Sequence, residues 1–353
     1  MRATALIINY HTEAFLPALI KVLEQESCIK EILIGDNGSS CGAAALQALS
    51  PKVRVHAFSE NIGFGAAVNT CVQQDVQTPY TLLLNPDTLP VPGFADRLLE
   101  TALKTGALIT APRCYLDAER RFRLPPFNGY VPGEAAMPIL PAEVLAHARA
   151  WTAFYENYWA QQSAFEEEFV SGACMMLHTA HSFFDGGQVF DPRFFMYFED
   201  ADLCLRARQA GFRIVTEPAA EVTHFWDQSP RSSKGSYMAA AQQQFFAKYP
   251  DYGPHFFMPA LSIPDAEALY GVSCTDAGEL SAGKLFHAED ARAGDYFELG
   301  INAIFIPFAQ AVMTDSSFRL PDGLAEKLPQ GSCFFRIRSP QNKIRAFWTS
   351  TKR

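Results

Sequence analysis

Four short apolar runs near the start of the chain each lead into a cluster of polar residues. The runs are Ala3–Ile8, Glu31–Gly35, Val53–Phe58 and Tyr80–Leu84, and apolar residues at helical spacing lie between them. Strands that alternate with helices form a largely parallel sheet covered on both faces. Such sheets bind ligands beyond the carboxyl ends of their strands. The pattern therefore predicts an α/β fold with a ligand site where the polar clusters lie.

Later segments continue this alternation to about residue 250. The spacing predicts helices over Phe94–Thr105, Asp200–Gly211 and Ser236–Tyr249, and strands over Leu108–Ala111, Phe169–His178, Arg213–Thr216 and Glu221–His224. From about Pro254 the pattern becomes strand-like, with expected strands at Tyr296–Phe308, Cys333–Ile337 and Ile344–Thr349. We therefore predict an α/β domain over residues 1–255 and a smaller β-rich domain over residues 256–353.

The 353 residues, 48% of them hydrophobic and 19% charged, have the composition of an ordinary soluble globular protein. A net charge of −9 disfavours nonspecific binding to nucleic acid. The best candidate for a membrane span, Leu299–Met313, is short and is broken by polar residues and a proline. The N-terminal segment lacks the features of a signal peptide. Eight cysteines without a C-x-x-C pair fit free thiols, so we predict a cytoplasmic location.

The acidic segment Phe195–Arg206 places three carboxylates directly after a run of aromatic residues. They belong to Glu199, Asp200 and Asp202. Burying acids beside aromatic side chains costs free energy unless the acids line a cleft or begin a helix. Aromatic neighbours and a second acid could raise the pKa of a carboxylate, which suits a general base. Two interpretations remain open, a catalytic carboxylate and a helix start whose acids complement the helix dipole.

Three upstream clusters could each serve a ligand or the local backbone. Asp36 precedes an Asn-Gly turn, so its carboxylate either contacts a ligand or caps the next helix. Asn61–Gly65 precedes a helix and contains two glycines, which allow a ligand anion or a neighbouring strand to approach closely. Asn85-Pro-Asp87 either binds a metal ion or forms a turn at the end of a strand.

The motifs in this order and spacing resemble those of inverting glycosyltransferases of family 2, which have the GT-A fold, and especially the rhamnosyltransferase-like subgroup. The segments that carry the resemblance are Ile7–Tyr10, Asp36–Ser39, Asn61–Asn69, Leu84–Thr88, Val170–Ala173, Glu199–Arg206 and His224. The resemblance covers roughly residues 3–250 and implies a catalytic domain over 1–255. It also implies transfer of a sugar from a dTDP- or UDP-linked donor to a bacterial surface glycan or a lipid-linked acceptor.

The resemblance implies a donor site and a metal site. The implied donor-site residues are Asn9, Tyr10, Asp36, Asn61, Gly65, Asn85, Asp87 and Arg231. Asp36 would accept the N3–H of a uracil or thymine ring. Asp87 and His224 would hold Mg²⁺ or Mn²⁺, which neutralises the charge of the departing diphosphate. Asn85 stands where the family's D-x-D motif has its first Asp, and this leaves fewer charged ligands. Arg231 would either clamp the diphosphate or remain a solvated charge.

The resemblance also assigns the acids of the segment at 199–202. Asp200 matches the family's catalytic Asp, the general base that takes a proton from the acceptor hydroxyl. Glu199 would orient this base or bind the acceptor. Asp202 and Arg206 are four residues apart, and we predict that they form a structural ion pair on one helical face.

Several alternatives stay open. The aromatic residues from Trp151 to Trp159 recur at helical spacing, which favours a core face over a platform for a sugar or lipid. The β-rich domain could bind glycan, mediate homo-oligomerisation or brace the catalytic domain. The chain could also touch the inner membrane face peripherally.

Two other functions are considered for the whole chain. A nucleotidyltransferase would need a Gly-rich basic loop after the first strand, where the chain has Asn9–Glu13. A non-catalytic glycan-binding protein would be expected to lack Asp87 or Asp200.

Overall fold

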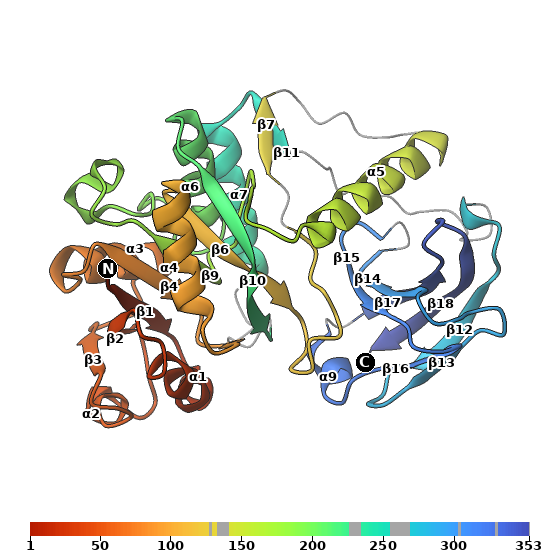
Figure 1. The fold of residues 1–353 in the computed structure, drawn as a ribbon, viewed down its shortest axis with the longest axis horizontal. Helices are drawn as coiled ribbons and strands as arrows, with labels where there is room; N and C mark the ends of the chain where they lie inside the picture. Colours follow the sequence, from red (N-terminus) through yellow and green to blue (C-terminus); the bar gives the residue numbers. More distant parts are fainter. Residues whose placement is uncertain are drawn as a thin grey trace. The chain divides into compact units, whose positions relative to one another are not determined.

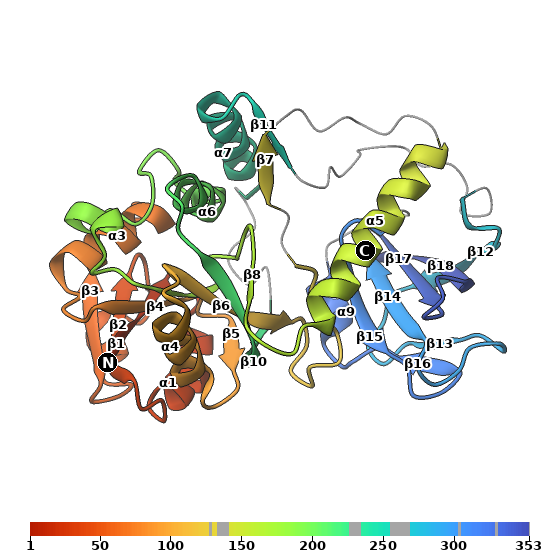
Figure 2. The ribbon, with the colours of Figure 1, turned by 45° about the horizontal axis from the view of Figure 1, so that its top comes forward.

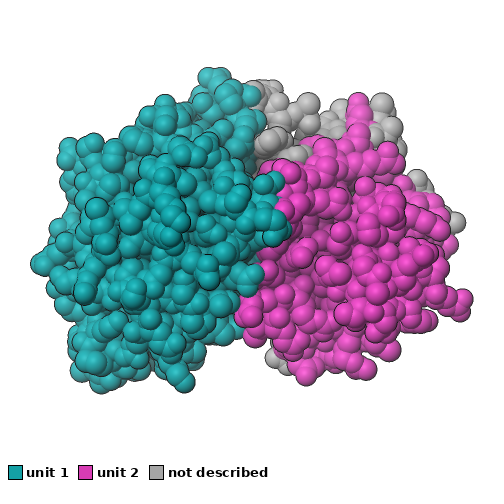
Figure 3. Space-filling view, viewed as in Figure 1, with its two compact units in different colours: residues 1–114, 127–134, 161–255 teal, residues 115–126, 135–160, 256–353 magenta. Residues whose placement is uncertain are grey.

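The computed structural model describes residues 1–126, 129–132, 141–225, 234–254, 269–302, 305–328 and 331–352. The described residues pack into two compact units, which Figure 3 colours separately. The first unit takes its residues from 1–114, 127–134 and 161–255, and the second from 115–126, 135–160 and 256–353. Residues 115–126 and 135–160 thus pack with the second unit, although they precede the boundary predicted after residue 255.

The first unit is built on a nine-stranded mixed sheet (Figure 1). Its strands are β1 (Ala3–Asn9), β2 (Ile29–Asp36), β3 (Val53–Ala57), β4 (Tyr80–Leu84), β5 (Thr88–Pro90), β6 (Ile109–Tyr115), β8 (Phe165–Glu166), β9 (Cys174–Leu177) and β10 (Ile214–His224). Their order is β3-β2-β1-β4-β9-β6-β10-β5, with β8 paired to β10. The strands β1 to β4 run parallel, and β9 is antiparallel to β4 and β6. The predicted α/β fold, with a mixed sheet flanked by helices, is confirmed.

Helices cover both faces of this sheet because successive side chains of each strand point to opposite sides. Leu6 and Ile8 of β1 belong to one core, together with side chains of α3, α6 and α7. Ala5 and Ile7 belong to the other core, with side chains of α1, α2 and α4. Figure 2 shows α1 and α4 together on one side of the sheet. The helices are α1 (Leu16–Leu23), α2 (Ala43–Gln47), α3 (Phe64–Gln74), α4 (Phe94–Thr105), α6 (Glu199–Gln209) and α7 (Lys234–Lys248).

Smaller elements complete the first unit. Two 3-10 helices, η1 (Glu13–Phe15) and η2 (Ser182–Gly187), lie between the regular elements. The strands β7 (Tyr130–Pro132) and β11 (Tyr252–Pro254) form an antiparallel pair of their own.

The strand register brings the predicted polar clusters to one edge of the sheet. Parallel pairing sets Asn9 beside Asp36 and Ile7 beside Leu84. Antiparallel pairing sets His224, the last residue of β10, beside Thr88. The polar residues that follow β1, β2 and β4 are therefore neighbours at the carboxyl edge, where the fold predicts a ligand site.

The second unit contains a five-stranded sheet of order β12-β18-β17-β14-β15 and a two-stranded sheet of β13 and β16. Its elements are α5 (Pro141–Ala160), β12 (Cys274–Glu279), β13 (Leu285–His287), β14 (Tyr296–Gly300), β15 (Phe308–Val312), β16 (Ser317–Arg319), α9 (Leu324–Lys327), β17 (Gly331–Arg338) and β18 (Ile344–Lys352). Trp151, Tyr155 and Trp159 of α5 are buried in this unit's core, which confirms the core interpretation of the aromatic stripe. Among the described residues, no helix is both long and apolar enough to cross a membrane.

Three of the predicted strands differ from the observed ones. The strands expected at Arg213–Thr216 and Glu221–His224 are the single strand β10, which runs through Pro218. The first part of β10 pairs with β8 and its last part with β5, so the proline, which has no N–H, falls between these two pairings. The strand expected at Tyr296–Phe308 is instead the antiparallel pair β14 and β15. Its residues fold back because Asn302 makes two hydrogen bonds with the backbone of Ile306.

Candidate active site

The first polar cluster surrounds the carboxylate of Asp36 at the ends of β1 and β2. Its Oδ1 accepts hydrogen bonds from Asn9 Nδ2 and the Gly38 N–H, both at 3.3 Å, and its Oδ2 accepts one from Ser39 Oγ at 2.7 Å. The Thr12 N–H and hydroxyl both donate to Asn9 Oδ1 and so fix the amide. A carboxylate has about four acceptor positions. The bonds within the described chain use three of them, and one position remains for a donor group of a ligand.

The turn at Asn61 is fastened to the end of β2 by the side chain of Asn37. Asn37 Nδ2 donates to Asn61 Oδ1 at 2.8 Å, and Asn37 Oδ1 accepts from the N–H of Ile62 at 3.0 Å. Asn61 Oδ1 also accepts from the N–H of Gly63 at 2.9 Å. The residues predicted on the nucleotide side from β1, β2 and this turn thus belong to adjoining, hydrogen-bonded segments.

The two glycines of this turn make room for the segment that leads to the acidic helix α6. A Cβ on Gly63 would lie 2.6 Å from the carbonyl oxygen of Phe195, and one on Gly65 would lie 3.3 Å from that of Phe194. The N–H of Phe64 donates to the same Phe195 oxygen at 2.9 Å. The glycines therefore serve close packing, which was one of the two interpretations of this motif. A nucleotide contact at Gly65 stays a prediction.

Asp87 and His224 approach each other from the turn after β4 and the end of β10. His224 Nε2 lies 3.5 Å from Asp87 Oδ1, and their side chains are 11% and 10% exposed. A carboxylate oxygen and an imidazole nitrogen suit a divalent cation such as Mn²⁺. Within the described residues, no group of three or more His, Cys, Asp or Glu side chains could hold a metal ion. The pair alone could supply two ligands to such a cation.

A single short segment connects the turn at Asn85 to the acidic helix. The N–H of Asn85 donates to the carbonyl oxygen of Ala173 at 2.8 Å. The N–H of the neighbouring Gly172 donates to Asp200 Oδ2 at 3.0 Å. The carboxylate predicted to act as the base and the turn that carries Asp87 thus lie on either side of residues 172–173.

The acidic helix α6 begins after a sharply turned backbone. Tyr197 and Phe198 have φ angles of 73° and 64°, in the left-handed region that side-chain-bearing residues rarely adopt. Such conformations cost about 1–3 kcal/mol each and cluster at functional sites. They place Glu199 and Asp200 in the first turn of α6, where the helix dipole favours negative charge. Asp200 Oδ1 accepts from the N–H of Ala201 at 2.8 Å, so this carboxylate is held through both of its oxygens.

The two adjacent acids differ in their surroundings. Glu199 is 7% exposed, and its Oε2 has no hydrogen-bond partner within the described part of the chain. Burial, and then the charge of Asp200, raise the pKa of Glu199 to about 8. Burial also raises the pKa of Asp200, but the N–H groups of Gly172 and Ala201 oppose that effect by stabilising the charged form. Only Asp200 has two N–H donors that stabilise its charged form, so the surroundings favour ionisation of Asp200 over ionisation of Glu199.

The remaining predicted site residues have the following positions. Tyr10 is half-buried, and its ring would lie 3.2 Å from a Cβ on Gly38. Arg231 lies outside the described residues. The ion pair predicted between Asp202 and Arg206 is confirmed, with 2.7 Å between Asp202 Oδ2 and Arg206 Nε.

Three residues that shape the site are absent from the residues predicted to form it. Asn37 and Gly172 stand inside recognised motifs, but nothing in those motifs says that their polar groups fix Asn61 and Asp200. Tyr130 of β7 is the third. Burial, and then the charge of Asp200, raise the pKa of Tyr130, so the phenol lies within electrostatic reach of that carboxylate. Tyr130 comes from a Pro/Gly-rich segment far upstream, where the sequence gives no sign of this proximity.

Comparison with protein families gives a match to the family described as Glycosyl transferase family 2, over residues 4–177. Among curated proteins, an N-acetylglucosaminyl-diphospho-decaprenol L-rhamnosyltransferase of Mycobacterium tuberculosis is 31% identical over 253 residues. That alignment covers 65% of this chain and 76% of the relative.

Solved structures are similar at lower identity. A structure of GalNAc-T7 with UDP, GalNAc and Mn²⁺ has 12% identity and a TM-score of 0.48, and the match covers 99% of this chain and 72% of that one. The mannosyltransferase PcManGT from Pyrobaculum calidifontis, in complex with GDP-Man and Mn²⁺, has 12% identity and a TM-score of 0.46. That match covers 70% of this chain and 64% of the other.

Proposed function

This chain belongs to glycosyltransferase family 2 and to its rhamnosyltransferase-like members, and on this premise we propose how it transfers a sugar. The donor is a dTDP- or UDP-linked sugar, and the acceptor is a hydroxyl group of a glycan or of a lipid-linked glycan. The reaction inverts the anomeric carbon in a single displacement. The observation that carries the proposal is the hydrogen-bonded connection from Asn85 through Ala173 and Gly172 to Asp200.

We assign the nucleotide to the cluster at the ends of β1 and β2. The open acceptor position of Asp36 can take the N3–H of uracil or thymine, while Asn9 and Ser39 hold the carboxylate in place. Tyr10 and Asn61 are assigned to the same side, and Gly65 to a position where its small size leaves room for the nucleotide. Asn85 and Arg231 are assigned to the diphosphate and donor sugar. The bonded arrangement around Asp36 supports this assignment because it fixes the direction in which the remaining acceptor position points.

We assign the divalent metal to Asp87 and His224, whose facing donor atoms fit it. A bound Mg²⁺ or Mn²⁺ would neutralise the negative charge of the departing diphosphate. The backbone fixes the distance between these two side chains, because the N–H of Phe225 donates to the Asp87 carbonyl oxygen at 3.0 Å. This bond joins the end of β10 to the turn after β4, so it restrains the side chains of both Asp87 and His224.

We assign the general base to Asp200. An acceptor hydroxyl is a weak nucleophile, so its proton must leave as the new bond forms. An oxygen of the Asp200 carboxylate takes that proton while the acceptor oxygen bonds to the anomeric carbon and the bond to the diphosphate breaks. The N–H groups of Gly172 and Ala201 hold the carboxylate in one orientation. Its raised pKa makes it a stronger base than an exposed aspartate.

Glu199 is assigned to the acceptor side as a hydrogen-bond donor. Its raised pKa means that the side chain carries a proton near pH 7, and its buried Oε2 has no partner within the described chain. A neutral acid next to a charged one can donate to a neighbouring hydroxyl of the acceptor without competing with Asp200 for the reacting proton. The two acids then have separate roles that follow from their different surroundings.

We take the acceptor class from the mycobacterial relative, whose name specifies a diphospho-decaprenol substrate. A polyprenyl-diphosphate glycan is therefore the first acceptor to test. Such an acceptor would bring the enzyme to the cytoplasmic face of a membrane, as a peripheral protein.

The test uses the 353-residue chain with Mn²⁺, a panel of dTDP- and UDP-sugars, and a polyprenyl-diphosphate N-acetylglucosamine acceptor. We expect turnover with at least one donor. Asp200→Asn should lower kcat by about 10²- to 10⁴-fold, the usual contribution of a general base, while donor binding persists. Asp290→Asn changes an exposed carboxylate in the second unit and is the matched control. Absence of binding and turnover with every donor, or an Asp200→Asn variant as active as the wild type, would reject the proposal.

A further inference from the structure

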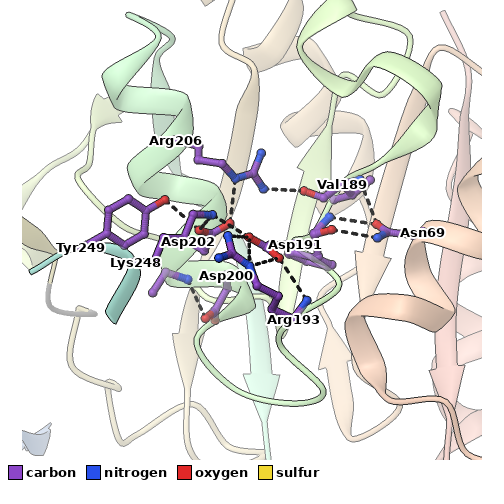
Figure 4. Close-up of polar contacts among 11 residues, drawn as sticks. Asn69, Val189, Asp191, Arg193, Asp200, Asp202, Arg206, Lys248 and Tyr249 are labelled. Carbon is purple, nitrogen blue, oxygen red and sulfur yellow. Dashed lines mark hydrogen bonds and ion pairs between the residues drawn. The ribbon is translucent and has the colours of Figure 1, made fainter. Parts of the chain in front are cut away.

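A buried polar cluster links α6 to α7 and to the segment that follows η2 (Figure 4). Asp202 of α6 is fully buried, and its Oδ2 accepts from Arg206 Nε at 2.7 Å. Its Oδ1 accepts from Tyr249 Oη at 2.8 Å and from Lys248 Nζ. Asp202 is the third acid of the motif that contains the proposed base, and it stands two residues after Asp200. Its partners therefore act on the first turn of α6.

Lys248, the last residue of α7, contacts two carboxylates at once. Besides Asp202, its Nζ bonds Asp191 Oδ2 at 2.7 Å, and its side chain is only 19% exposed. Arg193 also pairs with Asp191, at 2.6 Å. Burial opposes ionisation of Asp191, but the hydrogen bonds of Arg193 and Lys248 outweigh it and lower the pKa of this carboxyl. The ammonium group thus bridges the two carboxylates, and its removal would leave them facing each other without this shared cation.

The far end of the cluster reaches the helix that follows the glycine turn. Asn69 of α3 accepts from the N–H groups of Val189 and Phe190 at 2.9 Å and donates to the Phe190 carbonyl oxygen at 2.8 Å (Figure 4). Arg206 donates to the carbonyl oxygen of Val189 at 2.8 Å. We call Asn69, Asp191, Asp202, Arg206 and Lys248 the polar brace. It joins α3, α6 and α7 through the segment that leads to the base.

We infer that Lys248 is a positioning residue for Asp200. It holds Asp202 and Asp191 together, and so it fixes the first turn of α6 against the segment at 189–193. The base lies on that turn, and it must be within hydrogen-bond reach of the acceptor hydroxyl. A displacement of about 1 Å at a reacting group can cost about 100-fold in rate. This inference rests on the proposed function, because it concerns the same carboxylate.

The test compares Lys248→Met with Lys248→Arg, which keeps the positive charge, and with Lys104→Met. Lys104 forms an exposed ion pair with Glu100 on α4 and is the matched control. We expect Lys248→Met to lower kcat by about 100-fold, as ångström-scale misplacement does, while the Kd of the donor stays unchanged. Lys248→Arg should recover most of the rate, and Lys104→Met should behave as the wild type. Hydrogen exchange of the peptide 195–206 should quicken only in Lys248→Met.

The outcomes separate this inference from the proposed function. If the wild type transfers no sugar from any donor, the proposed function fails, and hydrogen exchange still shows whether Lys248 holds α6. If the wild type is active and Lys248→Met keeps its kcat while melting at a lower temperature, Lys248 is merely structural and the inference fails. Should Lys248→Met not fold, Asp191→Asn weakens one arm of the brace and leaves the pair of Lys248 with Asp202. A folded Asp191→Asn variant with wild-type kcat and wild-type exchange would also overturn the inference.

Discussion

The Gly172 nitrogen lies 3.0 Å from Oδ2 of Asp200, so the turn that leads into β9 of the central sheet directly orients the proposed catalytic carboxylate. The same segment accepts a hydrogen bond from the backbone of Asn85 through Ala173. The groups assigned to the diphosphate and to proton transfer are therefore spaced by the sheet itself.

The transfer rate should fall as the pH decreases through a pKa above the usual aspartate value. Burial raises the pKa of Asp200, and only its ionised form accepts a proton, so activity is present above that pKa and is lost below it. A profile of kcat/KM against pH for the wild type measures the pKa at which activity is lost on the acidic side. An acidic pKa at or below the unperturbed aspartate value of about 3.9 would contradict the assignment.

Glu199→Gln should keep most of the wild-type kcat at pH 7, because glutamine reproduces the shape of a protonated glutamate. The wild type should lose activity as the pH rises through about 8, where Glu199 ionises beside Asp200, and the variant should not. Glu289→Gln, at an exposed position of the second unit, should change neither property. An inactive Glu199→Gln variant at pH 7 would show that the ionised form is the working one.

Chelation of divalent ions should abolish transfer, and added Mn²⁺ should restore it. Asp87→Asn and His224→Ala should each weaken Mn²⁺ binding by about 100-fold or more, since loss of even an outer-shell partner typically costs 10- to 100-fold. Calorimetric titration with Mn²⁺ in the presence of a nucleotide diphosphate measures this independently of turnover. Unchanged Mn²⁺ affinity in both variants would show that Asp87 and His224 do not bind the metal.

Asp36→Ala should weaken binding of UDP by about 10- to 100-fold, the usual value of a hydrogen bond to a charged group. The affinity for CDP should stay the same, because the cytosine ring has no N3–H to donate. The two ligands share ribose and diphosphate, so their comparison isolates the base contact from any general damage to the pocket. An equal loss for both nucleotides would assign Asp36 a structural role only.

Glu298→Gln should destabilise the second unit without affecting donor affinity. Glu298 is fully buried in β14 and pairs with Arg336 and Arg338 of β17. Burial acts to raise its pKa, but the two guanidinium groups outweigh burial and lower it. Removing one partner of a buried ion pair costs about 3–5 kcal/mol, because the other charges stay buried. Urea unfolding measures the loss, and Glu289→Gln provides the exposed control. A change below about 1 kcal/mol would contradict this expectation.

The sequence was sufficient to predict much of the first unit because its polar clusters follow parallel strands. Tyr80–Leu84 and Phe94–Thr105 have the predicted bounds, since apolar periodicity and flanking glycine or proline mark their ends. The position of Asp36 beside Asn9 then follows from parallel pairing alone. Local pattern and global topology agree in this part of the chain.

Contacts between segments distant in sequence could not be predicted. Nothing local indicates that Tyr130 lies near Asp200, or that the N–H of Gly172 points at that carboxylate. The continuity of β10 through Pro218 also depends on which neighbouring strands pair at which positions. Each of these features is decided by tertiary packing, which outweighs local preference.

The left-handed backbone at Tyr197 and Phe198 has a consequence for how this enzyme could evolve. A glycine at either position would adopt the same turn without steric penalty, but it would also enlarge the entropy of the unfolded chain and delete a packed side chain. The ring of Phe198 lies 5.3 Å from that of Phe245 and 6.1 Å from that of Tyr130. Relief of strain at this turn therefore comes with lost packing beneath the acidic helix, and we expect selection to keep bulky side chains at both positions.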